Sequence, residues 1–125
     1  MLCGQTALIV EAQYLIALDM GHTLEHSAAC RVVIAQDADH ALELSSDWTD
    51  CGLAIVELEQ KLPRQIAFVG ELMRRNIPVI AITADADLPG KLSWFPTIPV
   101  LVKPISTDSI TAAVAAVLDL KMSGS

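Results

Sequence analysis

The sequence predicts an α/β fold, a single doubly wound domain in which a five-stranded parallel sheet carries helices on both faces. Short apolar runs alternate five times with longer amphipathic stretches along the 125 residues. The runs lack polar alternation, which is typical of strands buried on both faces of a parallel sheet. A β–α alternation of this kind joins parallel strands by right-handed crossovers through the helices.

The predicted strands are rich in Val and Ile and are bounded by polar residues, Gly or Pro. They span residues 7–10, 31–35, 53–56, 78–82 and 99–102. Because these runs are short and continuously apolar, they are expected to be central strands of one sheet.

Amphipathic stretches between and after these strands predict helices over residues 13–28, 37–44, 63–76 and 106–121. In the first helix, Leu15, Leu18 and Leu24 are expected to share one apolar face. The second opens with Asp37, an acidic residue suited to a helix N-terminus.

The two later helices have clearer start signals. Pro63 is expected in the first turn of one, and Ser106 is the predicted N-cap of the other. Their apolar stripes are Ile66, Val69, Leu72 and Met73 in the first, and Ile110, Ala113, Val114, Val117 and Leu118 in the second. Between them, segment 85–94 has the weakest helical pattern because Pro89 and Gly90 interrupt it.

Composition excludes several classes of protein. No apolar run reaches the roughly 18 residues that span a bilayer, and the N-terminus lacks the basic region of a signal peptide. The net charge of −7 argues against direct binding of nucleic acid. Three widely spaced cysteines predict neither a disulfide framework nor a zinc site. We expect a cytoplasmic domain over residues 1–122, with a polar tail at 123–125.

Polar residues follow four of the predicted strands. Glu11, Glu57, Thr83 and Lys103 each stand at or just after the end of a strand. In open parallel sheets, ligands and chemistry lie beyond the carboxyl ends of the strands. We therefore expect two carboxylates, a hydroxyl and an ammonium to converge, and the ammonium to offset the clustered carboxylates.

Four sequence blocks carry these residues: 8–11 (LIVE), 53–57 (LAIVE), 77–84 (IPVIAITA) and 100–104 (VLVKP). In order and spacing they resemble the motif blocks of bacterial response-regulator receiver domains, over essentially the whole chain. The resemblance implies the flavodoxin-like strand order 2-1-3-4-5.

Position by position, the resemblance places Glu11 in the first metal-binding acid slot and Ala12 in the second. Glu57 stands in the slot of the phosphoacceptor aspartate. Thr83 and Lys103 keep the switch hydroxyl and the lysine that neutralises the phosphoryl charge.

The acceptor chemistry departs from this pattern. Ala12 offers no carboxylate, and Glu57 extends the acceptor by one methylene, a misplacement that can cost about 100-fold in rate. The acceptor loop also differs, because Pro63 comes late. We expect no stable phosphorylation, no enzymatic activity and no resident cofactor, with Mg²⁺ binding at Glu11 and Glu57 weak at most.

The predicted function is that of an atypical receiver in phosphorelay signalling, acting through protein–protein contacts. In one mechanism Glu57 pairs with Lys103 and mimics the phosphorylated state; in the other the pocket is inert and the domain is a dimerisation or docking scaffold. A third alternative is a phosphoacceptor that uses Glu57. An enzyme or small-ligand binder of flavodoxin-like fold is disfavoured, because the turn at residues 11–14 has no glycine and carries a negative charge.

The resemblance also implies partners: a histidine kinase, a phosphotransferase or an output domain, or a second copy of the chain. We expect the contact surface on the fourth helix, fifth strand and fifth helix, around Trp94, Phe95 and Val100. No membrane contact is expected. His22 and His26 lie one helical turn apart, but no third ligand at a suitable spacing supports a zinc site.

Overall fold

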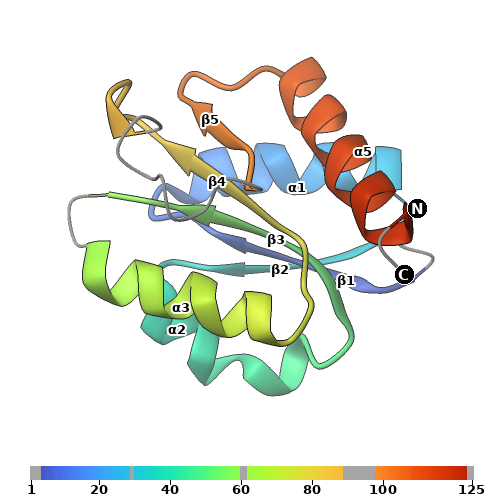
Figure 1. Cartoon of the computed structure of the whole chain (residues 1–125), viewed down its shortest axis with the longest axis horizontal. Coiled ribbons are helices and arrows are strands. Elements are labelled where there is room, and N and C mark those ends of the chain that lie inside the picture. Colours follow the sequence, from blue (N-terminus) through green and yellow to red (C-terminus); the bar gives the residue numbers. More distant parts are fainter. Residues whose placement is uncertain (1–3, 29, 60–61, 89–97, 124–125) are drawn as a thin grey trace.

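The sheet has the predicted strands, orientation and order. The computed structural model describes residues 4–28, 30–59, 62–88 and 98–123. The five strands are β1 (Thr6–Val10), β2 (Arg31–Ala35), β3 (Cys51–Glu57), β4 (Val79–Thr83) and β5 (Val100–Val102). They form a parallel sheet in the order β2-β1-β3-β4-β5 (Figure 1). This order confirms the doubly wound, flavodoxin-like topology.

Helices cover both faces of the sheet. They are α1 (Tyr14–Ala28), α2 (Ala38–Glu43), α3 (Leu62–Arg74) and α5 (Thr107–Ser123), with a short 3₁₀ turn at Ser45–Asp47. Helices α1 and α5 lie on one face, and α2 and α3 lie on the other (Figure 1). Most of segment 85–94, the weakest of the predicted helices, lies outside the described residues.

The predicted helix starts are confirmed by their caps. The Asp37 carboxylate accepts a hydrogen bond from the His40 N–H at 2.8 Å at the start of α2. The Ser106 hydroxyl accepts from the Ser109 N–H at 3.1 Å at the start of α5. Both side chains satisfy backbone donors that a helix N-terminus leaves without intrahelical partners.

The predicted apolar face of α1 is partly wrong. Leu24 is fully buried, but Leu15 is 80% exposed. At about 100° per residue, a separation of nine positions places Leu15 on the opposite side of the helix from Leu24. The face that packs on the sheet consists of Ala17, Met20, Gly21, Leu24 and Ala28. Met73, expected in the stripe of α3, is likewise exposed.

Small residues let α1 approach the sheet closely. A Cβ at Gly21 would lie 3.2 Å from Cγ1 of Val32 on β2. That distance is tighter than ordinary van der Waals contact, so a side chain at Gly21 would require the Val32 side chain to shift slightly. The middle of α1 therefore packs closely against β2.

Trp48 closes the core on the side of α2 and α3. Its side chain is buried, and its Nε1–H donates to the Ala41 carbonyl at 2.8 Å. The ring meets Phe68 edge to face with centroids 6.4 Å apart, and the Arg75 guanidinium lies over it. Trp48 thus serves packing, and its indole N–H is satisfied as a buried one requires. Among the described helices, none has the length and apolar character needed to cross a membrane.

Candidate functional site

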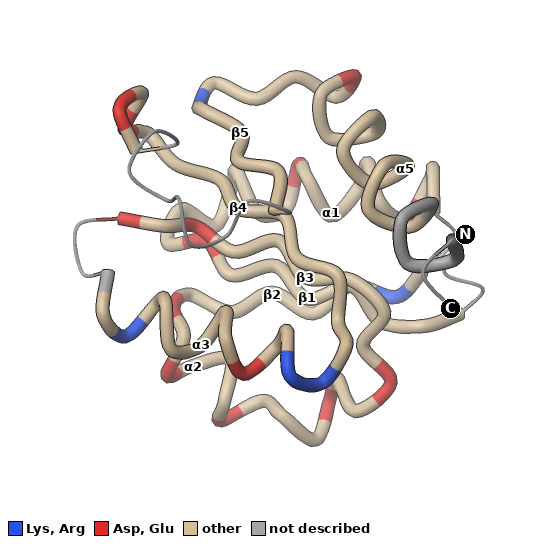
Figure 2. Tube along the Cα trace, in the orientation of Figure 1, with Lys and Arg blue, Asp and Glu red and all other residues tan. Residues whose placement is uncertain are grey.

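The sheet register gathers the predicted site residues at one edge. Val10 pairs with Val56, Glu57 with Ile82, and Thr83 with Val102. The strands thus end at nearly the same level, and Glu11 and Lys103 follow β1 and β5 directly. Acidic positions gather where β3 and β4 end (Figure 2). The structure thus brings Glu11, Glu57 and Lys103 into contact at this edge.

Lys103 bridges the two carboxylates. Its Nζ lies 2.5 Å from Oε1 of Glu11 and 2.5 Å from Oε2 of Glu57, where it donates a hydrogen bond. The side chains of Glu11, Glu57 and Lys103 are 0%, 8% and 15% exposed. The ammonium thus joins residues from the ends of three strands in a largely water-excluded place.

The turn after β1 holds the other oxygen of each carboxylate. Oε1 of Glu57 accepts the Ala12 N–H at 3.1 Å, and Oε2 of Glu11 accepts the Gln13 N–H at 2.9 Å. Oε1 of Glu11 is buried and accepts no well-oriented hydrogen bond from the described residues, so its contact with Lys103 is ionic. Glu57 is therefore the better satisfied of the two acids.

The two carboxyl groups differ in pKa although they share one ammonium. Burial is the largest influence on Glu11, and it raises the pKa of this group above the ordinary 4.5 despite its contacts with Gln13 and Lys103. Burial also acts to raise the pKa of Glu57, but hydrogen bonds from Lys103 and the Ala12 N–H outweigh it and lower that pKa. Burial acts to lower the pKa of Lys103, and the carboxylates reverse this and raise it. Glu57 and Lys103 form the charged pair, and Glu11 holds a proton more readily.

Thr83 reaches the same edge but does not bind Glu57. It is buried, and its hydroxyl oxygen accepts the Asp85 N–H at 3.1 Å. Within the described residues it makes no hydrogen bond with either site carboxylate. A Thr hydroxyl often hydrogen-bonds to a backbone group of its own turn, and such a local bond competes with bonds to more distant side chains.

The predicted partner surface is described only in part. Trp94 and Phe95 lie outside the described residues. Val100 is only partly exposed and packs against the core cluster on the side of α2 and α3. His22 and His26 are exposed on α1. No group of three or more His, Cys, Asp or Glu side chains suited to a metal ion occurs among the described residues.

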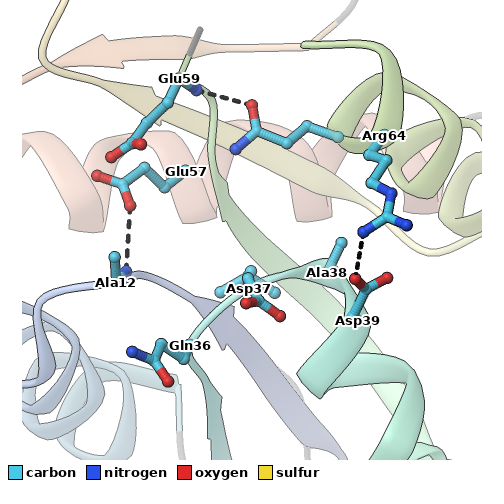
Figure 3. A pocket seen from close by; sticks show the side chains of 10 residues that line it. Ala12, Gln36, Asp37, Ala38, Asp39, Glu57, Glu59 and Arg64 are labelled. Carbon is cyan, nitrogen blue, oxygen red and sulfur yellow. Dashed lines mark hydrogen bonds and ion pairs between the residues drawn. The ribbon is translucent and has the colours of Figure 1, made fainter. Parts of the chain in front are cut away.

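A pocket of about 280 Å³ opens beside Glu57 (Figure 3). It is lined by Val10, Ala12, Gln36, Asp37, Ala38, Asp39, Glu57, Glu59, Arg64 and Gln65. The Glu59 N–H donates to Oε1 of Gln65 at 2.7 Å, and Arg64 binds Asp39 at 2.5 Å. The Ala12 methyl leaves part of this space open where a longer side chain would extend.

The sequence analysis missed most of this pocket. Gln36 and Asp37 follow β2, so the rule that selects the carboxyl ends of strands applied to them too. Arg64 and Gln65 stand in the first turn of α3, where no sequence signal distinguishes a pocket wall from a solvated surface. Glu59, in the loop after β3, is exposed and also lines the pocket.

Comparisons with known proteins address the fold. No family model matches this sequence, and no curated protein matches it. Among solved structures, it is similar to a CheY-like response regulator receiver domain protein of Methanospirillum hungatei JF-1, with a TM-score of 0.77 and 20% identity over 98% of this chain and 99% of that chain. It is also similar to the signal receiver domain of an HD domain-containing protein of Pseudomonas fluorescens Pf-5, with a TM-score of 0.76 and 23% identity over 96% and 98% of the two chains.

A third similar structure is the response regulator PhyR of Brucella abortus. The TM-score is 0.76 and the identity 28%, over 97% of this chain and 50% of that chain. These likenesses extend over nearly the whole described architecture, as the sequence motifs implied. The chain therefore has the fold of response-regulator receiver domains.

Proposed function

We propose that this domain is an atypical receiver that transmits signals through protein–protein contacts, with Glu57 as a built-in substitute for the phosphorylated acceptor. The observation that carries the proposal is the hydrogen bond from Lys103 to Glu57, 2.5 Å long and largely buried. In the receivers that this chain resembles, the lysine neutralises the charge of the phosphoryl group. Here the longer acid brings its own negative charge to the lysine.

The same geometry supports a role without a bound metal ion. Mg²⁺ needs near-ideal octahedral oxygen ligands, and Ala12 supplies none at the position of the second acid. Glu11 and Glu57, the two remaining carboxylates, already face the Lys103 ammonium. This donor set does not fit Mg²⁺, and the proposed function includes neither metal-dependent phosphoryl transfer nor other catalysis.

Thr83 favours the second candidate, an inert docking scaffold. Its hydroxyl oxygen is engaged by the Asp85 N–H rather than by the Glu57 carboxylate. Of the two residues that the resemblance assigns to the switch, Lys103 therefore contacts Glu57 and Thr83 does not. Partners of either candidate are signalling proteins, and the surface around Trp94 and Phe95 stays a prediction.

A double-mutant cycle tests the role of the Glu57–Lys103 pair. We expect Glu57→Gln and Lys103→Ala each to lower the free energy of unfolding in urea, because each leaves a buried polar partner unsatisfied. The coupling energy between the two changes is expected at roughly 0.5–3 kcal/mol. Arg64→Ala with Asp39→Asn is the matched control, an exposed ion pair worth about 1 kcal/mol or less.

Two outcomes decide between the candidates. Amide NMR shifts that change along β5 and α5 in both single variants support a switch held by the pair. Strict additivity in the cycle, with shifts confined to the two substituted positions, assigns the domain to the inert scaffold instead.

A further inference from the structure

Two side chains hold the start of α2 with hydrogen bonds to the backbone. The Asp37 carboxylate accepts the His40 N–H at 2.8 Å, and Nδ1 of the His40 ring accepts the Gln36 N–H at 2.9 Å. In a capping box, a Glu or Gln at the third helical position accepts a backbone N–H from the residues before the helix. His40 is the third residue of α2, so an imidazole takes that place here. The start of α2 therefore depends on an acceptor that a proton can remove.

The bond from Gln36 defines the state of the His40 ring. A ring nitrogen that accepts a hydrogen bond carries no proton, so the neutral ring holds its one proton on Nε2. A proton taken up from solvent binds Nδ1, the nitrogen that has a lone pair, and turns this acceptor into a donor. The Gln36 N–H then faces another N–H, so the bond breaks and the ring turns away. Histidine is the residue type whose charge most readily changes between about pH 5 and 8.

Few other contacts keep the start of α2 in place. The helix has six residues, of which only Ala41 is buried, and short helices form poorly by themselves. The chain from Gln36 to Asp39 also forms one wall of the pocket beside Glu57 (Figure 3). A change in the His40 ring therefore acts directly on a wall of this pocket.

We propose that protonation of His40 loosens the start of α2 and, with it, the pocket wall formed by residues 36–39. With the neutral ring, both side-chain bonds hold this wall. With the charged ring, only the bond to the Asp37 carboxylate remains. The inference is independent of the proposed function, because it does not involve the Glu57–Lys103 pair.

The charged groups around α2 affect how readily the ring takes up a proton. Asp37, Asp39 and Glu43, on the helix and its cap, favour a charged ring, whereas the helix N-terminus disfavours it. Among the described residues, no ion pair involves the His40 ring, and Arg64 and Glu71 are engaged by other side chains. The elements packed on α2 carry these charged residues: Arg31 on β2, Asp47 in the 3₁₀ turn, and Arg64, Glu71, Arg74 and Arg75 on α3.

An NMR titration of the unaltered protein tests the inference. Ring ¹⁵N shifts at pH 8 should place the proton of His40 on Nε2. Between pH 8 and pH 5, we expect the hydrogen-exchange protection of the Gln36 amide to fall about two- to tenfold, because one hydrogen bond is lost. Its amide proton should shift upfield together with the titration of the His40 ring. The rings of His22 and His26, which are exposed on α1, are the internal references.

Two substitutions separate the role of the proton from that of the side chain. His40→Gln supplies an acceptor that does not titrate, so Gln36 should stay protected at both pH values. His40→Ala removes the acceptor, so Gln36 should show the low protection at both pH values. His26→Gln is the matched control and should leave the response of Gln36 to pH unchanged. Thermal unfolding shows whether each variant folds.

Three outcomes overturn the inference. One is a ring proton on Nδ1 at pH 8, which excludes the bond from Gln36. Another is a Gln36 amide that does not respond while the His40 ring titrates. The third is a response to pH that persists in His40→Gln, which assigns it to an acid such as Glu11, whose pKa is raised by burial. The urea cycle at Glu57 and Lys103 does not involve His40, so failure here leaves the proposed function intact.

Discussion

Lys103 offers one positive charge to two buried carboxyl groups, so the two acids compete for it. The turn after β1 donates a backbone N–H to each acid, but only Glu57 also receives a hydrogen bond from the ammonium. The low exposure of these groups strengthens the electrostatic differences between them. Opposite pKa shifts in two neighbouring glutamates are the measurable result.

We expect the carboxyl group of Glu11 to titrate above 4.5 and that of Glu57 below it, because burial prevails at Glu11 and hydrogen bonding prevails at Glu57. Carboxyl ¹³C shifts followed against pH measure both. In Lys103→Ala, the pKa of Glu57 should rise above 4.5, because the hydrogen bond from Lys103 no longer counteracts the effect of burial. Unchanged titration of Glu57 in that variant contradicts the ion pair.

The two shifts have opposite effects on stability. Glu57, with its lowered pKa, stabilises the fold above pH 4.5, and this contribution is lost as the pH falls through its folded pKa. Glu11, with its raised pKa, favours the fold while protonated, and that contribution is lost as the pH rises from 4.5 through its folded pKa. We therefore expect Glu57→Gln to show a smaller loss of stability toward acid pH in urea unfolding than the unaltered protein, with the remaining loss due to other carboxyl groups of lowered pKa such as Asp50 and Glu71.

At the scale of elements, α2 depends on its cap more than the longer helices do. It has six residues, and Ala41 is its one buried residue. A helix this short gains little from its own hydrogen bonds, since nucleation is costly. The Asp37 cap therefore contributes a large share of the order in a segment that also lines the pocket.

We expect Asp37→Ala to lower the free energy of unfolding by about 1 kcal/mol, with a range of roughly 0.5–2, because a backbone N–H of α2 loses its acceptor. Urea denaturation measures the change. Asp39→Ala is the matched control, an acid two residues on whose exposed ion pair with Arg64 contributes about 1 kcal/mol at most. A larger loss from Asp39→Ala than from Asp37→Ala contradicts the capping argument.

At the scale of the molecule, the sequence predicted the fold well because each strand is a continuous apolar run. The convergence of Glu11, Glu57 and Lys103 followed from the fold, since parallel strands share one carboxyl edge. The failures have local causes. Leu15 was assigned to the buried face of α1 because it is apolar, although its angular position places it on the exposed face. Thr83 was expected to contact the site carboxylates, but its hydroxyl oxygen accepts the Asp85 N–H in the turn after β4. The pocket is a space between elements: the strand-end rule points to Gln36 and Asp37, but nothing in the sequence marks Arg64 and Gln65 as its other wall.

The whole site also predicts how the acceptor chemistry is restored. We expect no phosphoryl adduct on the unaltered protein after incubation with acetyl phosphate and Mg²⁺, by intact-mass spectrometry. The double variant Ala12→Asp with Glu57→Asp should gain Mg²⁺-dependent phosphorylation, because it supplies the second acid and shortens the acceptor. The single variant Ala12→Asp is the control. An adduct at Glu57 in the unaltered protein contradicts the proposal, and an unreactive double variant assigns the defect to the loop before Pro63.

The short edge strand β5 has a consequence for local unfolding. It has three residues and pairs on one side only, with β4, so it belongs to the part of the sheet that opens at the lowest free energy. Lys103 follows it at once and is bound to residues that follow β1 and end β3. The ammonium therefore ties the fraying edge to the centre of the sheet and raises the free energy of opening there. A protein that binds only the closed edge is thermodynamically linked to the ion pair: the pair strengthens its binding, and its binding strengthens the pair by the same factor.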